Sequence, residues 1–128
     1  MDMSCSLSAY LSASIKGLCT HAVVDVDGLE STSQASKSGM YLLVDGVMSN
    51  DHAVYQQKYG DRAYLYYWTS YKDWIIGSDY SSTNSMGVIS RDNKKSTCPD
   101  EVTNWHYYDG NTWVSSAAIK ISYGPFWA

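Results

Sequence analysis

The side chains that most often carry out chemistry are thinly spread through this 128-residue chain. It has three histidines, His21, His52 and His106, and 20 serines, so a Ser-His-Asp set can always be drawn on paper. No Gly-x-Ser-x-Gly segment is present to hold one serine on a strained, exposed turn as a nucleophile. Only Glu30 and Glu101 are Glu among the 13 acids, and there is no paired-carboxylate motif of the kind that glycosidases use. The sequence therefore predicts that the protein is not an enzyme.

Metal ligands are equally sparse. Cys19-Thr20-His21 offers two ligands for zinc, but no second pair follows at a usable distance. Asp25-x-Asp27-Gly28 and Asp45-Gly46 resemble fragments of calcium loops, and both lack the remaining oxygen ligands at the required offsets. We predict no metal and no other cofactor, with calcium the one ion that the sequence leaves open.

The cysteine count limits the disulfides. Cys5, Cys19 and Cys98 are an odd number, so at most one internal disulfide forms and one thiol is left free or pairs between chains. Which two pair stays open at this stage, as does the alternative of three unpaired thiols.

Aromatic residues beside polar turns are the pattern that points to a binding function. A sugar presents an apolar face of C–H groups and an edge of hydroxyls, so its site needs an aromatic ring with planar hydrogen-bonding side chains nearby. The chain places such groups at three turns, where the candidates are Asn50, Asp51 and His52; Trp68 and Tyr71 with Lys72 and Asp73; and Trp105, His106, Asp109, Asn111 and Trp113. Aromatic residues on strands are more often core residues or cross-strand partners. We assign that framework role to Tyr64, Tyr66, Tyr67, Trp74 and Trp113.

The elements that must position these groups are strands. Seven Leu stand against fifteen Val and Ile, a balance that favours strands over helices. Alternating segments predict strands over residues 5–15, 40–44, 47–55, 64–68, 74–77, 86–89, 105–108, 112–114 and 117–122, and one that ends at Gly28. Hairpin turns are expected at Asp45-Gly46, over 69–73 and over 109–111, and a polar loop over 30–39. Residues 1–128 thus form one all-β domain, an antiparallel sandwich or barrel of short strands and hairpins.

Charge and hydropathy exclude two classes of partner. The net charge of −4 and the scattered basic residues argue against nucleic acid, which needs a basic track for its phosphates. No apolar run approaches the roughly 18 residues of a membrane span, so we expect no membrane insertion. The start of the chain lacks a basic segment followed by an apolar one, so we predict no signal peptide in this chain.

From Gly39 onward a set of Gly, Tyr, Trp and Pro residues follows a recurring pattern. The matching residues are Gly39-x-Tyr41, Asn50, Tyr55, Tyr64-Leu65-Tyr66-Tyr67, Trp74-Ile75-Ile76-Gly77-Ser78-Asp79, Cys98-Pro99, Trp105 and Asp109-Gly110-x-x-Trp113. Over residues 39–121 the chain resembles a module of secreted proteins of marine invertebrates. It departs from that pattern by lacking a closing Cys after Ile121, which leaves the partner of Cys98 open.

The size and the start of the chain are also similar to those of small sugar-binding lectins of marine tube worms. That resemblance implies a lectin for galactose-type or N-acetylated sugars that assembles as a homodimer or larger oligomer and is secreted. It supplies no binding residues. Because the matched positions of the module are mostly scaffold types, the binding groups are expected among unmatched loop residues such as His52, Arg62, Trp68, Arg91 and Asn93.

The sequence thus predicts a non-catalytic, extracellular protein whose partners are glycans. The predicted sugar-binding residues are Asn50, Asp51, His52, Arg62, Trp68, Arg91, Asn93, Trp105, His106, Asp109 and Asn111. The alternative is a structural or adhesive module of an extracellular matrix that binds other proteins.

Overall fold

The computed structural model describes residues 18–93 and 95–124, so the strand expected over residues 5–15 lies outside the described part. The expected all-β class is confirmed, because strands and two short 3-10 helices account for the regular structure of the described residues. In chain order the elements are β1 (Val23–Asp27), η1 (Ala35–Lys37), β2 (Gly39–Ser49), β3 (His52–Gln57), β4 (Tyr64–Trp68), β5 (Asp73–Gly77), β6 (Met86–Ser90), η2 (Pro99–Glu101), β7 (Trp105–Tyr108), β8 (Trp113–Ser115) and β9 (Lys120–Tyr123). No helix among these residues is long and apolar enough to cross a membrane.

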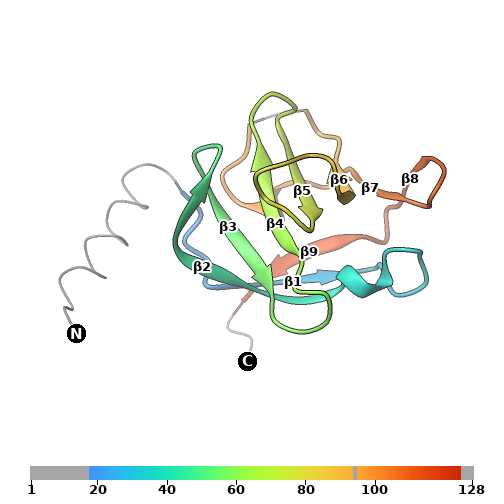
Figure 1. The fold of residues 1–128 in the computed structure, drawn as a ribbon, viewed down its shortest axis with the longest axis horizontal. Coiled ribbons are helices and arrows are strands. Elements are labelled where there is room, and N and C mark those ends of the chain that lie inside the picture. Colours follow the sequence, from blue (N-terminus) through green and yellow to red (C-terminus); the bar gives the residue numbers. More distant parts are fainter. Residues whose placement is uncertain (1–17, 94, 125–128) are drawn as a thin grey trace.

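The strands form one antiparallel sheet that curls into a half-barrel (Figure 1). Its order is β8-β7-β6-β5-β4-β3-β2-β1-β9, so each strand from β1 to β8 lies beside its neighbour in sequence. The exception is β9, which returns across the molecule to pair with β1 and sets Ile121 opposite Val26. The sheet therefore consists of successive hairpins and one long-range pairing.

Both faces of the central strands are apolar. In β4, Leu65 and Tyr67 belong to the larger buried cluster, whereas Tyr64, Tyr66 and Trp68 belong to the smaller cluster on the opposite face. This is the alternation that a strand imposes on successive side chains. In β5 and β6 the same alternation assigns Trp74, Ile76 and Val88 to the larger cluster, and Ile75 and Ile89 to the smaller one. The sequence did not separate the two faces, because both are filled with hydrophobic and aromatic residues.

Buried tyrosines take the place that Phe and Leu take in other cores. The hydroxyl of Tyr41 donates a hydrogen bond to the Lys37 carbonyl oxygen (2.7 Å), and that of Tyr66 donates to the Ser82 carbonyl oxygen (2.7 Å). Burial raises the pKa of Tyr66 to about 12, so its hydroxyl remains a donor at all ordinary pH values. The hydroxyl of Tyr67 is buried and has no hydrogen-bond partner among the described residues.

The first predicted hairpin turn is in the wrong place. Asp45 and Gly46 lie inside the long strand β2, where the pairing with β3 shifts register between Leu43 and Met48. The turn follows four residues later, at Asn50 and Asp51, whose φ angles are 53° and 59°. Gly46 also has a positive φ, of 77°. Because a β-bulge and a tight turn both favour residues that tolerate a positive φ, the sequence alone did not distinguish between them here.

The two later hairpins agree with their predictions. The β4–β5 turn occupies residues 69–72, and the β7–β8 turn occupies residues 109–112. The polar segment 30–39 is largely a loop that contains η1, and the predicted closing strand over 117–122 lies at Lys120–Tyr123. The turns at 69–72 and 109–112 therefore carry polar side chains at the ends of these strands.

Candidate functional site

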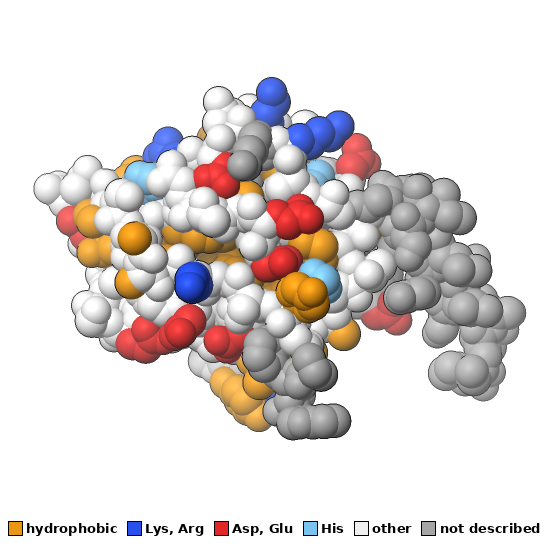
Figure 2. Space-filling view, turned by 180° about the vertical axis from the view of Figure 1, so that it is seen from behind, with side chains coloured by type: hydrophobic (Ala, Val, Ile, Leu, Met, Phe, Trp, Pro, Cys, Tyr) orange, Lys and Arg blue, Asp and Glu red, His pale blue; other side chains and the backbone are white. Residues whose placement is uncertain are grey.

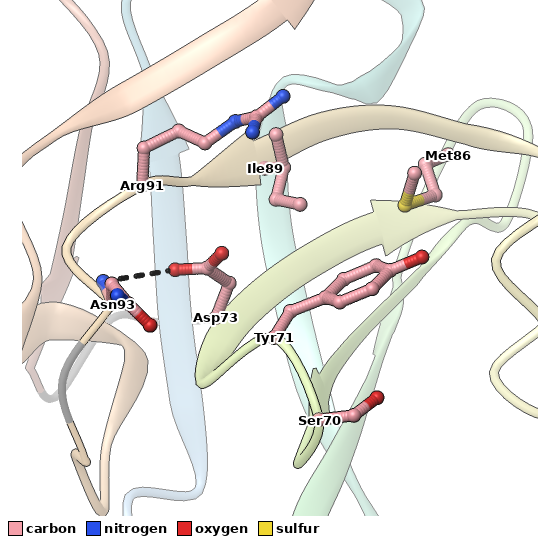
Figure 3. A pocket seen from close by; sticks show the side chains of 7 residues that line it. All are labelled: Ser70, Tyr71, Asp73, Met86, Ile89, Arg91 and Asn93. Atoms are coloured by element: carbon pink, nitrogen blue, oxygen red, sulfur yellow. Dashed lines mark hydrogen bonds between the residues drawn. The ribbon is translucent and has the colours of Figure 1, made fainter.

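A hollow in the described surface lies over the β4–β5 turn and along β5 and β6 (Figure 3). Its volume is about 520 Å³, within the range of small-molecule sites in proteins. Its lining comes from two segments that are paired in the sheet: Ser70, Tyr71, Asp73, Met86, Ile89, Arg91 and Asn93. The pairing of Ile75 with Ile89 brings these segments together.

The hollow combines an aromatic wall with an apolar floor. Tyr71 is 41% exposed although its ring is large and apolar. Its side chain extends toward Met86, while Ile89 lies on the neighbouring strand (Figure 3). Ile89 is buried in the smaller apolar cluster and Met86 packs at the edge of that cluster, so both are held in place by the core rather than by solvent-exposed loops.

The polar residues gather at one end of the hollow. The Asp73 carboxylate oxygen Oδ1 accepts a hydrogen bond from the backbone N–H of Asn93 (3.3 Å) and from the Ser90 hydroxyl (3.4 Å). The guanidinium carbon of Arg91 lies 5.8 Å from the centre of the Trp113 ring, a cation–π distance that restrains this side chain. Asn93 has a φ of 52°, a left-handed conformation that Asn tolerates better than most residues. A carboxylate and an amide thus lie side by side, and the Arg91 guanidinium extends from the same end of the hollow over Ile89 (Figure 3).

Burial sets the protonation behaviour of Asp73. The residue is only 5% exposed, and this desolvation raises the pKa of its carboxyl above the ordinary value. The hydrogen bonds from Asn93 and Ser90, and the positive charge of Arg91, act in the opposite direction and are smaller. Oδ2 accepts no hydrogen bond from the described residues. Asp73 therefore carries a carboxylate that its own fold leaves partly unsatisfied.

Of the predicted sugar-binding residues, Arg91 and Asn93 line this hollow. The sequence places Tyr71 and Asp73 at a turn without predicting that they bind sugar, and Ser70, Met86 and Ile89 have no sequence signal for a site. Trp68 packs against the smaller apolar cluster, with its ring 6.4 Å from that of Tyr66.

Asn50 and His52 have structural tasks. The side-chain oxygen of Asn50 accepts a hydrogen bond from the Thr69 backbone N–H (2.9 Å), which ties the β2–β3 turn to the β4–β5 turn. The His52 ring stacks on Tyr67 at 3.7 Å. Its nitrogens lie 2.8 Å and 2.7 Å from the carbonyl oxygens of Asn50 and Ser96. Asp51, between them, is exposed at the tip of the turn.

The predicted residues of the β7–β8 hairpin do not line the hollow. Trp105 is 1% exposed and its indole N–H donates to the Val102 carbonyl oxygen (3.2 Å), so it is a core residue that a surface ligand does not reach. Hydrogen bonds from the backbone N–H groups of Thr112 and Asn111 hold the pKa of Asp109 below its usual range, because they stabilise the carboxylate within the turn. The Nδ1 atom of His106 lies 3.3 Å from the Asn104 carbonyl oxygen, and the Asn111 side chain is exposed.

Arg62 lies in a different and smaller hollow. That hollow, of about 250 Å³, is formed by β2, β3 and the turn after β3, and Arg62 lines it together with Gln56 and Lys58. The guanidinium donates a hydrogen bond to the Gln56 side-chain oxygen (3.2 Å). No acidic residue or aromatic ring lines it, so it lacks the combination found beside Tyr71.

A second cluster of reactive side chains lies where the chain enters β1. Cys19 and Cys98 form a disulfide, 79 residues apart in sequence. His21 lies beside them, with its Nε2 atom 3.4 Å from the Asp100 oxygen Oδ1 and its ring stacked on Tyr123 at 3.7 Å. The sequence had left the pairing open. It showed no second pair of ligands near Cys19 and His21, and the fold brings Cys98 and Asp100 beside them from a distant segment.

Acidic and basic side chains are largely separated on one face of the molecule. In Figure 2, acidic side chains are spread over the middle and lower part of one face, and most of the Lys and Arg side chains visible there gather at its upper edge. This face carries no continuous basic track.

The chain matches no protein-family model, no curated protein and no solved structure. The resemblance to a marine-invertebrate module and to tube-worm lectins therefore stays a prediction.

Proposed function

We propose that the protein binds carbohydrate in the hollow beside Tyr71 and does not transform it. The observation that carries this proposal is the combination in one hollow of an exposed tyrosine, an apolar floor, a carboxylate, a guanidinium and an amide. Aromatic rings contact the C–H face of a sugar, and planar polar groups bind its hydroxyls in pairs.

Every lining residue except Ser70 has a definite task in this proposal. Tyr71 stacks on the sugar ring, and Asp73 accepts hydrogen bonds from hydroxyls through the oxygen that no described residue occupies. Arg91 and the Asn93 amide donate to hydroxyl or carbonyl oxygens. The floor of Met86 and Ile89 accepts a methyl group. Galactose-type and N-acetylated sugars are therefore the proposed ligands: the first offers an apolar C–H face, and the second also offers a methyl group and an amide.

The proposal includes a setting and an assembly. A disulfide that closes 79 residues is typical of oxidising compartments, which supports a secreted protein. A single shallow sugar site binds weakly, so several sites on a homodimer or larger oligomer would raise the avidity for a glycan-covered surface.

A glycan array with the wild-type protein and the Tyr71→Ala variant tests the proposal. We expect wild-type binding to simple galactose-type or N-acetylated sugars, and a loss of about fivefold or more in Tyr71→Ala, since stacking on an aromatic side chain contributes on the order of 1–3 kcal/mol where the ligand is a nucleobase. The matched control is Tyr59→Ala, because Tyr59 is also an exposed tyrosine on a turn, at 68%, and does not line the hollow.

A second pair of variants separates the two hollows. Arg91→Gln is expected to weaken sugar binding, whereas Arg62→Gln is expected to leave it unchanged. Binding that Arg62→Gln abolishes and Arg91→Gln does not would move the site to the smaller hollow. Silence on the array at high protein concentration, together with capture of a protein ligand that free sugars do not displace, would favour the adhesive-module alternative and reject the sugar site.

A further inference from the structure

The cluster around the Cys19–Cys98 disulfide contains the parts of a metal site. The potential ligand atoms of Cys19, His21, Cys98 and Asp100 all lie within 4.8 Å of one another. Two Cys-x-His or Cys-x-Asp segments, far apart in sequence, face each other there: one leads into β1 and the other begins η2. After reduction of the disulfide, these four residues supply two thiols, one imidazole and one carboxylate, which are ligand types that zinc binds.

We propose that, once the disulfide is reduced, Cys19, His21, Cys98 and Asp100 bind one Zn²⁺ ion in a tetrahedral site. This proposal is independent of the sugar site. In the oxidised state each sulfur is bonded to the other, so neither is available as a thiolate ligand. The disulfide and the metal are thus alternative cross-links between the same two segments.

One polar atom of the cluster lacks a hydrogen-bond partner. The Asp100 oxygen Oδ1 is buried, yet it accepts no hydrogen bond within the described residues. His21 Nε2 lies 3.4 Å from this oxygen, which is an ion-pair distance when the imidazole is protonated, but no hydrogen bond joins the two atoms. A buried carboxylate oxygen without a partner carries a desolvation cost. A cation between Asp100 and His21 would remove that cost.

Hydrogen-bond donors already face both sulfur atoms. The Tyr55 hydroxyl lies 3.2 Å from the Cys19 Sγ atom and 2.8 Å from the His21 carbonyl oxygen, and its single proton can be donated to either of them. The backbone N–H of Glu101 faces the Cys98 sulfur in the capping arrangement of η2. Donors of this kind stabilise thiolates and orient metal ligands from outside the coordination sphere.

The geometry needs only small movements. Ligand atoms of a tetrahedral zinc ion are separated by roughly 3.3–3.8 Å, and the separations here reach 4.8 Å at most. The Cα atoms of the two cysteines are 4.9 Å apart. Cys19 and Cys98 are buried, whereas the side chains of His21 and Asp100 are 25% and 19% exposed. The imidazole and carboxylate therefore form the side through which an ion enters.

The chemistry balances with a dithiol reductant. The dithiol is oxidised to its disulfide as the Cys19–Cys98 bond takes up two electrons and two protons and becomes two thiols. Zn²⁺ then displaces the two thiol protons into solvent and binds the thiolates, the neutral imidazole and the carboxylate. A small disulfide oxidant, which takes up the two electrons and becomes its dithiol, restores the Cys19–Cys98 bond and releases the ion.

The test uses the full chain with Cys5→Ser, so that only the two clustered cysteines remain. The protein is reduced with a phosphine, desalted without oxygen, and titrated with Zn²⁺ against a chromophoric chelator and with Co²⁺ in a spectrophotometer. We expect one ion per reduced chain, the visible bands of tetrahedral Co²⁺ with a thiolate charge-transfer band, and no binding by the oxidised chain. Near-ultraviolet circular dichroism reports whether the zinc form keeps the tertiary packing of the disulfide form.

Variants that retain both cysteines separate a built site from loose thiols. His21→Gln and Asp100→Asn are expected to weaken zinc binding at least about tenfold, the minimum seen when groups that merely support a ligand are removed. The matched controls, His106→Gln and Asp51→Asn, are expected to bind zinc as the parent does. Equal zinc affinity in all four variants would overturn the proposal, as would a reduced chain that loses its near-ultraviolet signal and does not recover it with zinc.

Discussion

Removing the disulfide is expected to cost a large part of the stability of the fold. The bridge joins Cys19 and Cys98 across 79 residues. For a closed loop of that length, the chain-entropy relation gives about 15 cal/mol/K, or about 4.5 kcal/mol at room temperature. Domains of this kind are stable by about 5–15 kcal/mol, so the variant Cys19→Ala/Cys98→Ala is expected to be near the limit of folding. Alanine is preferred to serine because both sites are buried and a hydroxyl there would need a partner.

Urea denaturation followed by tryptophan fluorescence measures this cost. Trp74 and Trp105 are both buried, so their emission reports loss of the core. With a slope of about 2 kcal/mol/M, a loss of 4.5 kcal/mol moves the midpoint down by about 2 M. The measurement is made with a chelator present, so that no metal replaces the disulfide as a cross-link.

Two comparisons decide whether the reasoning is right. Wild-type protein reduced in the same buffer is expected to show a shift similar to that of the double variant, and Cys5→Ala is expected to keep the wild-type midpoint. A loss below about 1 kcal/mol in both the variant and the reduced protein would refute the entropic account. A large shift in Cys5→Ala would refute the pairing itself.

Three further predictions follow from single positions. Gly28→Ala is expected to destabilise the fold by more than about 2 kcal/mol in urea melts, because its φ is 91° and a Cβ there would lie 1.9 Å from the Ala118 carbonyl oxygen; a wild-type midpoint would show that this contact can open freely. Tyr66→Phe is expected to cost about 1 kcal/mol because its hydroxyl bonds Ser82, whereas Tyr67→Phe is expected to be neutral or stabilising because its buried hydroxyl has no partner among the described residues; the reverse order would contradict the hydrogen-bond assignment. Asp73→Asn is expected to be no less stable than wild type at neutral pH while it binds sugar more weakly. Burial raises the pKa of the Asp73 carboxyl in the folded protein above its ordinary value of 3.8. As the pH rises between these two pKa values, the wild type therefore loses stability relative to this variant. Parallel curves of stability against pH for the two proteins would contradict this.

The local parts of the fold were predictable from the sequence because local rules decide them. The β4–β5 and β7–β8 hairpins follow from aromatic alternation and from polar residues at their turns. Asp45-Gly46 misled because a bulge and a turn both select residues that tolerate a positive φ. The choice between the two depends on the pairing of β2 with β3, which no short segment encodes.

The candidate site was only partly predictable because it is assembled across strands. Arg91 and Asn93 stood out as polar loop residues. The wall and floor come from Tyr71 and Met86, which lie toward opposite ends of the β5–β6 pair and approach each other because the Tyr71 side chain extends toward Met86. Trp105 illustrates the opposite error. The period of two groups the side chain of Trp105 with the side chains of every second residue on its strand. It does not show which face of the strand is buried in the core.

The pairing of β9 with β1 affects the tendency of this protein to self-associate at high concentration. A strand at the border of a sheet presents unpaired N–H and C=O groups that another chain can join. Without β9, β1 would be an exposed edge strand that is prone to aggregation because it contains Val23, Val24 and Val26. β9 covers this edge through pairs such as Val24 with Tyr123. Since β9 is the last strand in chain order, the other eight can assemble while that border is still open. Clipping the chain before Lys120 should therefore favour fibrous self-association before it noticeably disturbs the hollow beside Tyr71.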